Sequence, residues 1–182
     1  MKLDRLQRAL QTGNWGQAAD ILAPLVAGAD PHPSMMYNYG KVLIELGRMA
    51  QAQAMLRRTV QVMPEHSAAW FELGRAALSA EDFETGFEAF SRALDLEPTD
   101  TDARRNLGRV GVRLGRFGAA QAAWSELRGD PEADLALYRI AAETGAANTS
   151  DLRRDLLDNH PDKAAVIRTL VRVSKGSVPL SL

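Results

Sequence analysis

Hydrophobic residues recur at intervals of three and four along most of the chain, which is the spacing of an amphipathic helix. The clearest helices are expected at 67–80 and 82–98, where apolar positions line one face and a short polar break separates the two segments. Three N-caps are expected, at Ser67, Asp82 and Asp130, since a short polar side chain there can accept from the first free backbone N–H groups. The pattern therefore predicts paired helices and an all-α chain.

The pattern repeats every 34 residues. At this spacing five columns of the self-alignment carry similar residues in successive copies, and two of these columns are rich in glycine. The first glycine column is Gly40, Gly74 and Gly108, and the second is Gly13, Gly47 and Gly115. A fixed period of this length is typical of helical repeat proteins, in which stacked copies share a continuous core.

The segment 68–98, "AAWFELGRAALSAEDFETGFEAFSRALDLEP", resembles a tetratricopeptide repeat. The matching positions are Trp70, Leu73, Gly74, Phe83, Phe90, Ala93 and Pro98. The resemblance implies an all-α, right-handed superhelical solenoid of antiparallel helix pairs with a C-terminal helical cap. We expect a degenerate N-terminal helix pair at 1–32, three repeats at 33–66, 67–100 and 101–131, and capping helices with a tail at 132–182.

Composition narrows the function. The 182 residues include no cysteine, which excludes disulfides, thiolate metal sites and cysteine nucleophiles. The formal net charge of −1 gives no general reason to bind nucleic acid or an anionic membrane. No stretch approaches the roughly 20 apolar residues that a transmembrane helix needs, and the charged start lacks a signal-peptide core. We therefore expect a cytoplasmic protein that binds neither nucleic acid nor membrane.

The resemblance implies that the first helix of each pair faces a concave groove where a partner binds. The repeat register places nine candidate binding residues there: Tyr37, Asn38, Lys41, Phe71, Arg75, Arg105, Asn106, Arg109 and Arg113. Three of the cations, Lys41, Arg75 and Arg109, share one column. Because arginine binds carboxylates bidentately, we expect a protein or peptide partner that is acidic or presents a C-terminal carboxylate.

Several alternatives stay open at this stage. The cationic face is also explained as a solvated surface that pairs with Glu72 or Asp102. Residues 101–128 carry a net charge of +4 and residues 129–162 carry −5, so neighbouring segments could bind each other. Three aspartates of the cap, Asp151, Asp155 and Asp158, could act as an internal ligand for Arg105 and Arg109. The chain would then be a structural or oligomerisation module, monomeric or homodimeric, or a regulatory domain of a larger protein.

Other chemistry is not predicted. The three histidines, His32, His66 and His160, stand beside prolines at repeat ends and are interpreted as turn residues, not metal ligands. We expect no catalytic residues, metal or cofactor. In the glycine-rich segment "LGRVGVRLGRFG" (107–118), Gly108 is expected at a close helix contact and Gly115 at a turn. Gly111 and Gly118 have no predicted structural role, so this repeat is expected to be locally softer.

Overall fold

The structure is a computed structural model that describes residues 2–28 and 30–174, and within these ranges it contains eleven α helices and no strand. The chain divides into two compact units, residues 1–103 and 104–182. The predicted tail, "SVPLSL", lies outside the described residues. No helix in the described ranges is long and apolar enough to cross a membrane. The cytoplasmic location stays a prediction.

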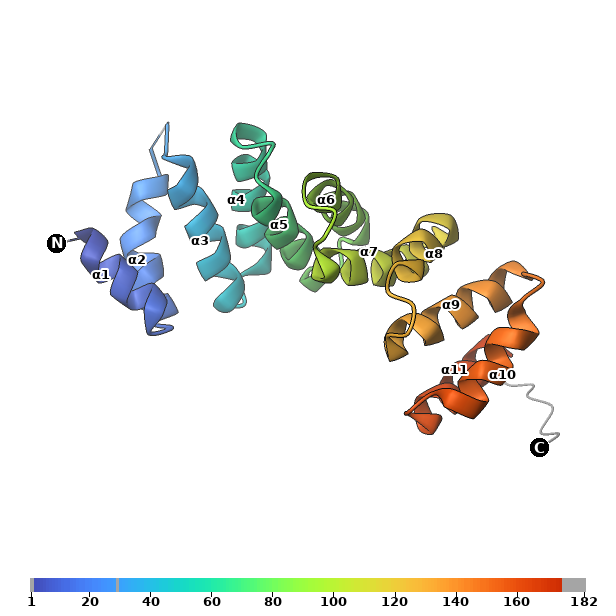
Figure 1. The fold of residues 1–182 in the computed structure, drawn as a ribbon. Helices are drawn as coiled ribbons and strands as arrows, with labels where there is room; N and C mark the ends of the chain where they lie inside the picture. Colours follow the sequence, from blue (N-terminus) through green and yellow to red (C-terminus); the bar gives the residue numbers. More distant parts are fainter. Residues whose placement is uncertain (1, 29, 175–182) are drawn as a thin grey trace. The chain divides into compact units, whose positions relative to one another are not determined.

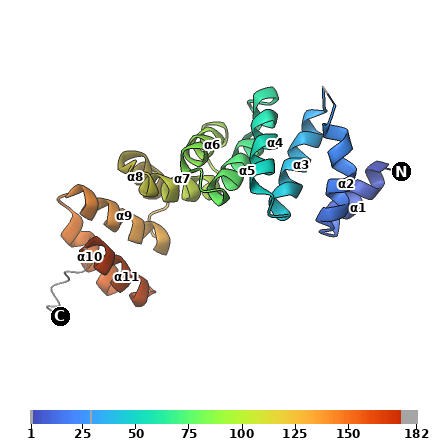
Figure 2. The same ribbon diagram turned by 180° about the vertical axis from the view of Figure 1, so that it is seen from behind.

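The first unit is built from three antiparallel helix pairs (Figures 1 and 2). Its helices are α1 (Lys2–Gln11), α2 (Trp15–Val26), α3 (Pro33–Glu45), α4 (Met49–Val62), α5 (Ser67–Ser79) and α6 (Phe83–Leu96). Only three residues join each helix to its partner within a pair, and connections this short force the two helices to run antiparallel. Each pair then packs on the next, because α2 contacts α3 and α4 contacts α5.

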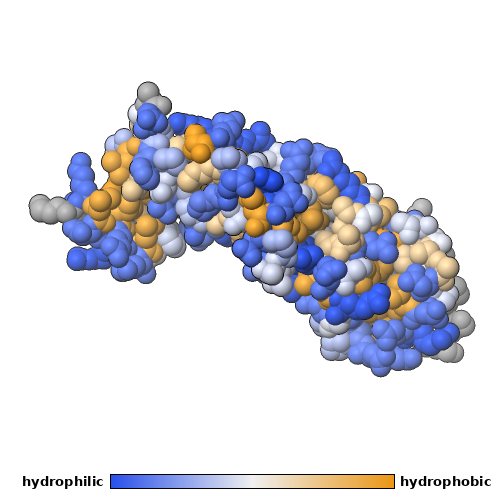
Figure 3. All heavy atoms as spheres, turned by 45° about the horizontal axis from the view of Figure 1, so that its top comes forward, coloured by the Kyte–Doolittle hydropathy of each residue, from blue (hydrophilic) through white to orange (hydrophobic). Residues whose placement is uncertain are grey.

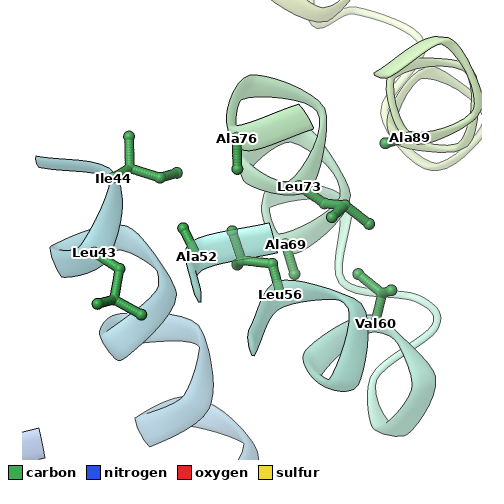
Figure 4. Packing of buried hydrophobic residues seen from close by; sticks show 9 residues of the cluster. All are labelled: Leu43, Ile44, Ala52, Leu56, Val60, Ala69, Leu73, Ala76 and Ala89. Atoms are coloured by element: carbon green, nitrogen blue, oxygen red, sulfur yellow. The ribbon is translucent and has the colours of Figure 1, made fainter. Parts of the chain in front are cut away.

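Alanine and leucine side chains form the core of this unit. Leu43 of α3, Leu56 of α4 and Leu73 of α5 are almost fully buried in one cluster. Figure 4 shows side chains of α3, α4 and α5 directed into the space between these helices, with the small Ala69 and Ala76 on the α5 side. Small residues at these positions allow close helix packing, so the core is continuous from one helix pair to the next.

The second unit includes most of α7 (Thr101–Arg113) and continues with α8 (Phe117–Ser125), α9 (Pro131–Thr144), α10 (Thr149–Asn159) and α11 (Lys163–Val173). Its largest buried side chain is Trp124 of α8, which packs with Val112 of α7 and Leu137 and Ile140 of α9. A second cluster joins α9, α10 and α11 around the buried Tyr138, Leu156 and Val166. The helix α9 therefore supports both neighbours, α8 on one side and α10 with α11 on the other.

The helix starts agree with the sequence analysis at two positions and differ at one. Asp82 and Asp130 are N-caps, and their carboxylates accept from the backbone N–H groups of Thr85 and Ala133, respectively. Ser67, however, is the first residue of α5 and not its cap. The cap is His66, whose Nδ1 accepts from the backbone N–H of Ala69 at 3.0 Å. A neutral imidazole nitrogen offers the same acceptor as a serine hydroxyl, which explains the exchange.

One glycine column marks the closest helix contacts. A β-carbon at Gly40 would lie 2.6 Å from Leu56, and one at Gly74 would lie 2.7 Å from the Phe90 ring. In the second unit, Gly111 also has a packing role, contrary to expectation: a β-carbon there would lie 3.0 Å from that of Ala120. Gly118 has no neighbouring atom within 4 Å of such a β-carbon, so its lack of a packing role agrees with the sequence analysis.

The other glycine column lies at the turn within each helix pair. Gly13, Gly47 and Gly115 have φ values of +67°, +72° and +70°, which a residue without a β-carbon adopts readily. The equivalent position in the remaining pair is Glu81, and it has the same left-handed conformation with φ of +59°. Among the described residues it is the only non-glycine with positive φ, so this turn carries local backbone strain.

On the face drawn in Figure 3, hydrophobic residues gather in separate patches between hydrophilic ones. In the part of the chain that the structure describes, six large apolar side chains are exposed: Leu3, Leu25, Val62, Leu157, Ile167 and Val171. Ile167 and Val171 are one helical turn apart on α11 and therefore lie on one face of that helix.

Candidate functional site

The candidate residues of the first unit lie on α3 and α5, the first helices of two successive pairs. Lys41 of α3 and Arg75 of α5 approach the same carboxylate, that of Glu72: Nζ of Lys41 lies 3.9 Å and Nη1 of Arg75 lies 2.8 Å from its oxygens. Arg75 also lies 3.9 Å from Glu45 on α3. The two helices are thus joined by alternating positive and negative side chains, as in the alternative that named Glu72 as an ion-pair partner.

Glu72 is the buried centre of this face. It is 7% exposed, whereas the side chains of Lys41 and Arg75 are 47% and 41% exposed. A buried carboxylate is costly unless it is paired and hydrogen-bonded. Glu72 therefore holds the two cations in place, and the exposed parts of both cations remain in contact with solvent.

Aromatic rings flank the same charges. The Tyr37 ring contacts the His66 ring with centroids 4.8 Å apart and the ring planes tilted by 44°. Nζ of Lys41 lies 5.5 Å from the Tyr37 centroid, within cation–π range. Burial raises the pKa of Tyr37, although nearby Lys41 acts in the opposite direction. Phe71 is partly buried and meets Phe90 edge-on at 5.7 Å, so it contributes to packing as well as to this face.

The candidate residues of the second unit lie on α7. Nη2 of Arg105 lies 3.0 Å from Asp130, and Nε of the same side chain lies 3.7 Å from Glu132. Arg109 binds Glu132 bidentately, with Nε donating to Oε1 at 2.5 Å and Nη2 donating to Oε2 at 2.6 Å. Asn106 accepts from Nη1 of Arg109 at 3.4 Å. The structure thus brings Arg105, Asn106 and Arg109 together, and Arg113 lies exposed in the last turn of the same helix.

The acids that meet these arginines belong to the N-terminus of α9. Asp130 caps that helix, and its carboxylate serves both the cap and Arg105. Partial burial acts to raise the pKa of Asp130, but the hydrogen bonds from Arg105 and from the backbone of Ala133 and Glu132 outweigh it, so the pKa lies below its usual value. Sequence analysis identified Asp130 as a cap but missed its contact with Arg105, which is 25 residues away in the chain.

The internal-ligand hypothesis named different acids. Asp151 of α10 pairs with Arg154 of the same helix, and Asp155 accepts from Asn159, also on α10. Arg105 and Arg109 are instead bound by Asp130 and Glu132, because these residues start the helix that packs next to α7 and α8. In the structure both arginines pair with the start of α9, whereas the hypothesis had named Asp151, Asp155 and Asp158.

The histidines act at helix ends. Nδ1 of His32 accepts from the backbone N–H of Ser34, as His66 does for Ala69. His160 is buried: Nε2 lies 3.0 Å from the carbonyl of Pro131, and Nδ1 accepts from the N–H of Asp162. Within the described ranges no three histidine or acidic side chains are grouped so as to hold a metal ion.

Comparison with known families identifies the type of repeat. The chain matches the family model described as tetratricopeptide repeat over residues 3–60, 40–101 and 80–134. These three overlapping segments run from α1 to the first turn of α9. Most of α9 and the helices α10 and α11 lie outside the match.

Solved structures with the same fold include the MamA protein and YrrB. A crystal structure of MamA is 16% identical, covers 100% of this chain and 94% of its own, and has a TM-score of 0.73. YrrB, described as a TPR protein with an unusual peptide-binding site, is 17% identical, covers 90% of this chain and 87% of its own, and has a TM-score of 0.76. At these identities the likeness concerns the fold, a tetratricopeptide-type solenoid.

Proposed function

The chain belongs to the tetratricopeptide repeat family, and we propose that it is a non-catalytic protein-interaction scaffold that binds acidic peptide segments. The binding surfaces are the face of α3 and α5 in the first unit and the face of α7 in the second. The observation that carries the proposal is the repeated cation: Lys41, Arg75 and Arg109 occupy one repeat position, and each is held by a glutamate.

Preorganisation supports the proposal in physical terms. A long cationic side chain normally loses rotamer freedom when a ligand binds, and this loss weakens binding. Here Glu72 and Glu132 already restrict the cations, so less entropy is lost when a carboxylate arrives. Tyr37 beside Lys41 adds an aromatic surface on which a peptide backbone can stack. The peptide-binding site described for YrrB provides an analogy on the same fold.

A selection experiment tests the proposal. The full chain is immobilised and presented with a display library of random peptides, and we expect acidic residues to be enriched among the bound sequences. The affinity of one selected peptide is then measured by fluorescence anisotropy for the wild type and for the double variant Arg105→Gln/Arg109→Gln. We expect the double variant to bind about tenfold more weakly, since charge-assisted hydrogen bonds are lost.

The matched control is Arg58→Gln/Arg154→Gln, which removes the same charge from two exposed side chains on the second helices of their pairs. Thermal unfolding of all variants checks that the fold is intact. Selection of peptides without acidic enrichment, or equal loss of affinity in both double variants, would contradict binding through these faces.

A second candidate function is self-association through α11. Ile167 and Val171 are 58% and 45% exposed on one face of this helix, and an apolar stripe of this kind suits a second copy of the chain. Sedimentation equilibrium of the wild type and of Ile167→Ser/Val171→Ser distinguishes a monomer from a dimer. A wild-type chain that stays monomeric at high concentration would remove this candidate.

A further inference from the structure

A cavity of about 260 Å³ lies within the second unit, walled by residues of α7, α8, α9 and α11. Three arginines from three different helices line it: Arg109 of α7, Arg139 of α9 and Arg172 of α11. Glu132 is the acidic residue in the same wall. The lining therefore carries more positive than negative charge.

The charges of this wall are not equally compensated. Glu132 is bound bidentately by Arg109, so these two side chains largely neutralise each other. Among the described residues, Glu143 provides the one carboxylate at ion-pair distance from Arg139, and its Oε1 lies 3.6 Å from Nε, too far for a good hydrogen bond. For Arg172, the described part of the chain provides no carboxylate within ion-pair distance. Arg139 and Arg172 thus supply the surplus positive charge.

Two buried donors in the wall lack acceptors. Nε of Arg139 and Nε1 of Trp124 are both inaccessible to solvent and form no hydrogen bond. Buried N–H groups in folded proteins are nearly always paired, because an unpaired donor loses its bond to water without compensation. Nε1 of Trp124 faces Gly108, and Nε of Arg139 is likewise shielded, so these two atoms are not available to a ligand in the cavity. The Arg139 side chain is nevertheless 29% exposed, and its charge adds to the positive wall of the cavity. The surplus positive charge favours a ligand that offers oxygen acceptors and a negative charge.

Size and apolar character limit the ligand further. Pockets for drug-sized ligands have volumes of about 300–1,000 Å³, so this cavity is suited to one peptide side chain or chain end, not to a nucleotide cofactor. Trp124 and Leu135 form an apolar part of the wall, against which methylene groups can pack. A carboxylate on a short aliphatic stem fits both the charged and the apolar portions.

We propose that this cavity binds a peptide carboxylate, either a glutamate side chain or a C-terminus, through Arg139 and Arg172. This inference rests on the proposed peptide-binding function and assigns a specific subsite to it. Both arginines lie beyond residue 134, where the family match ends. The subsite therefore belongs to the C-terminal helices of this chain and not to the repeat pattern.

The test uses the full chain and an acidic peptide obtained from the display selection. Its affinity is measured by fluorescence anisotropy for the wild type, Arg139→Gln and Arg172→Gln, with Arg154→Gln as a control for charge on the exposed face of α10. We expect each of the first two variants to raise the dissociation constant about tenfold and the control to leave it unchanged. Arg172 is exposed in the last turn of α11, so its substitution leaves the fold intact even where Arg139→Gln does not.

Modified peptides then identify the carboxylate. One peptide has an amidated C-terminus and the other has its glutamate exchanged for glutamine. The modification that removes the bound carboxylate should weaken binding to the wild type, and the wild type and Arg172→Gln should then bind that peptide with equal affinity. The modification that abolishes the difference in affinity between the wild type and Arg172→Gln identifies the source of the carboxylate.

The two proposals fail differently. If the peptide binds and only the Arg105→Gln/Arg109→Gln variant loses affinity, the cavity inference is wrong while the proposed function stands. If no acidic peptide binds the wild type at all, both are wrong.

Discussion

The indole of Trp124 packs directly on the backbone of Gly108, so that a β-carbon at position 108 would lie 2.5 Å from the indole Nε1. The same relation joins Gly40 to Leu56 and Gly74 to Phe90 within the first unit. One large side chain of the second helix thus fills the space that each glycine leaves on the first. This contact sets how closely the helices of a pair approach.

Substitution of this glycine should destabilise the fold. Gly108→Ala gains helix propensity of about 1 kcal/mol but forces Trp124 or α7 to move, and overpacking of a buried contact costs about 1–3 kcal/mol. We expect a net loss of stability, measured by urea unfolding. Gly118→Ala is the matched control, since no atom lies within 4 Å of its β-carbon, and it should be neutral or stabilising. Equal behaviour of the two variants would argue against the Trp124 contact.

The turn at Glu81 offers a stabilising substitution. Glu81 has φ of +59°, and the equivalent residues Gly13, Gly47 and Gly115 have glycine at nearly the same φ. Left-handed backbone costs a residue with a β-carbon about 1 kcal/mol or more, so Glu81→Gly should raise the free energy of unfolding by up to about 1 kcal/mol. Gly47→Ala, the reverse change at an equivalent turn, should lower it. Thermal unfolding measures the stability of both variants, and a lower stability of Glu81→Gly than of the wild type would contradict backbone strain at this turn.

Asp130 makes stability depend on acid. Its pKa is lowered in the folded state, so its contribution is complete above the unfolded value of about 3.9 and is lost as pH falls through the folded pKa. Asp130→Asn keeps an N-cap acceptor but removes the charge that binds Arg105. We expect this variant to be slightly less stable at neutral pH and to lose less stability on acidification.

Urea midpoints between neutral pH and pH near 3 measure this effect. The stability of Asp130→Asn should still depend on pH to some extent, because the pKa of Asp82 is also lowered, chiefly by the hydrogen bond with Thr85. If the wild type and Asp130→Asn have parallel pH profiles, the pairing with Arg105 is not stabilising.

His160 joins α9 to the turn before α11. The Pro131 carbonyl only accepts, so Nε2 of His160 carries the proton and Nδ1 accepts from the N–H of Asp162. His160→Leu leaves both backbone groups without this partner in a buried site, which should cost about 1–3 kcal/mol. His32→Leu, which removes an exposed cap, should cost less. Unfolding curves of the two variants measure both losses of stability. Losses of similar size would show that burial of His160 is unimportant.

Local residue patterns were sufficient for the helices and for much of their packing. The period of 34 residues identified which glycines meet a large side chain and which lie in turns, because both roles depend on positions within one helix pair. The caps at Asp82 and Asp130 were predictable for the same reason. Gly111 was misjudged because the equivalent residues in the other repeats are Leu43 and Ala77, so its column gave no sign of the close contact with Ala120.

The charged faces were predictable only in part. The sequence placed Lys41, Arg75 and Arg109 at one repeat position, but it did not identify the acids that hold Arg105 and Arg109. Segment charges suggested the acids of α10, whereas the structure selects Asp130 and Glu132. The acids could not be identified from the sequence because an ion pair forms only where two charged side chains lie within a few ångströms of each other, and the packing of the helices decides this.

The sequence by itself therefore determined the helices, their pairing and the positions of the closest packing, since these follow from the period and size of apolar residues. Tertiary structure alone decided which charges neutralise one another and that Arg109, Arg139 and Arg172 line a single cavity. Those relations arise between residues distant in the chain, and a 34-residue period does not describe the C-terminal helices that bring two of these arginines to the cavity.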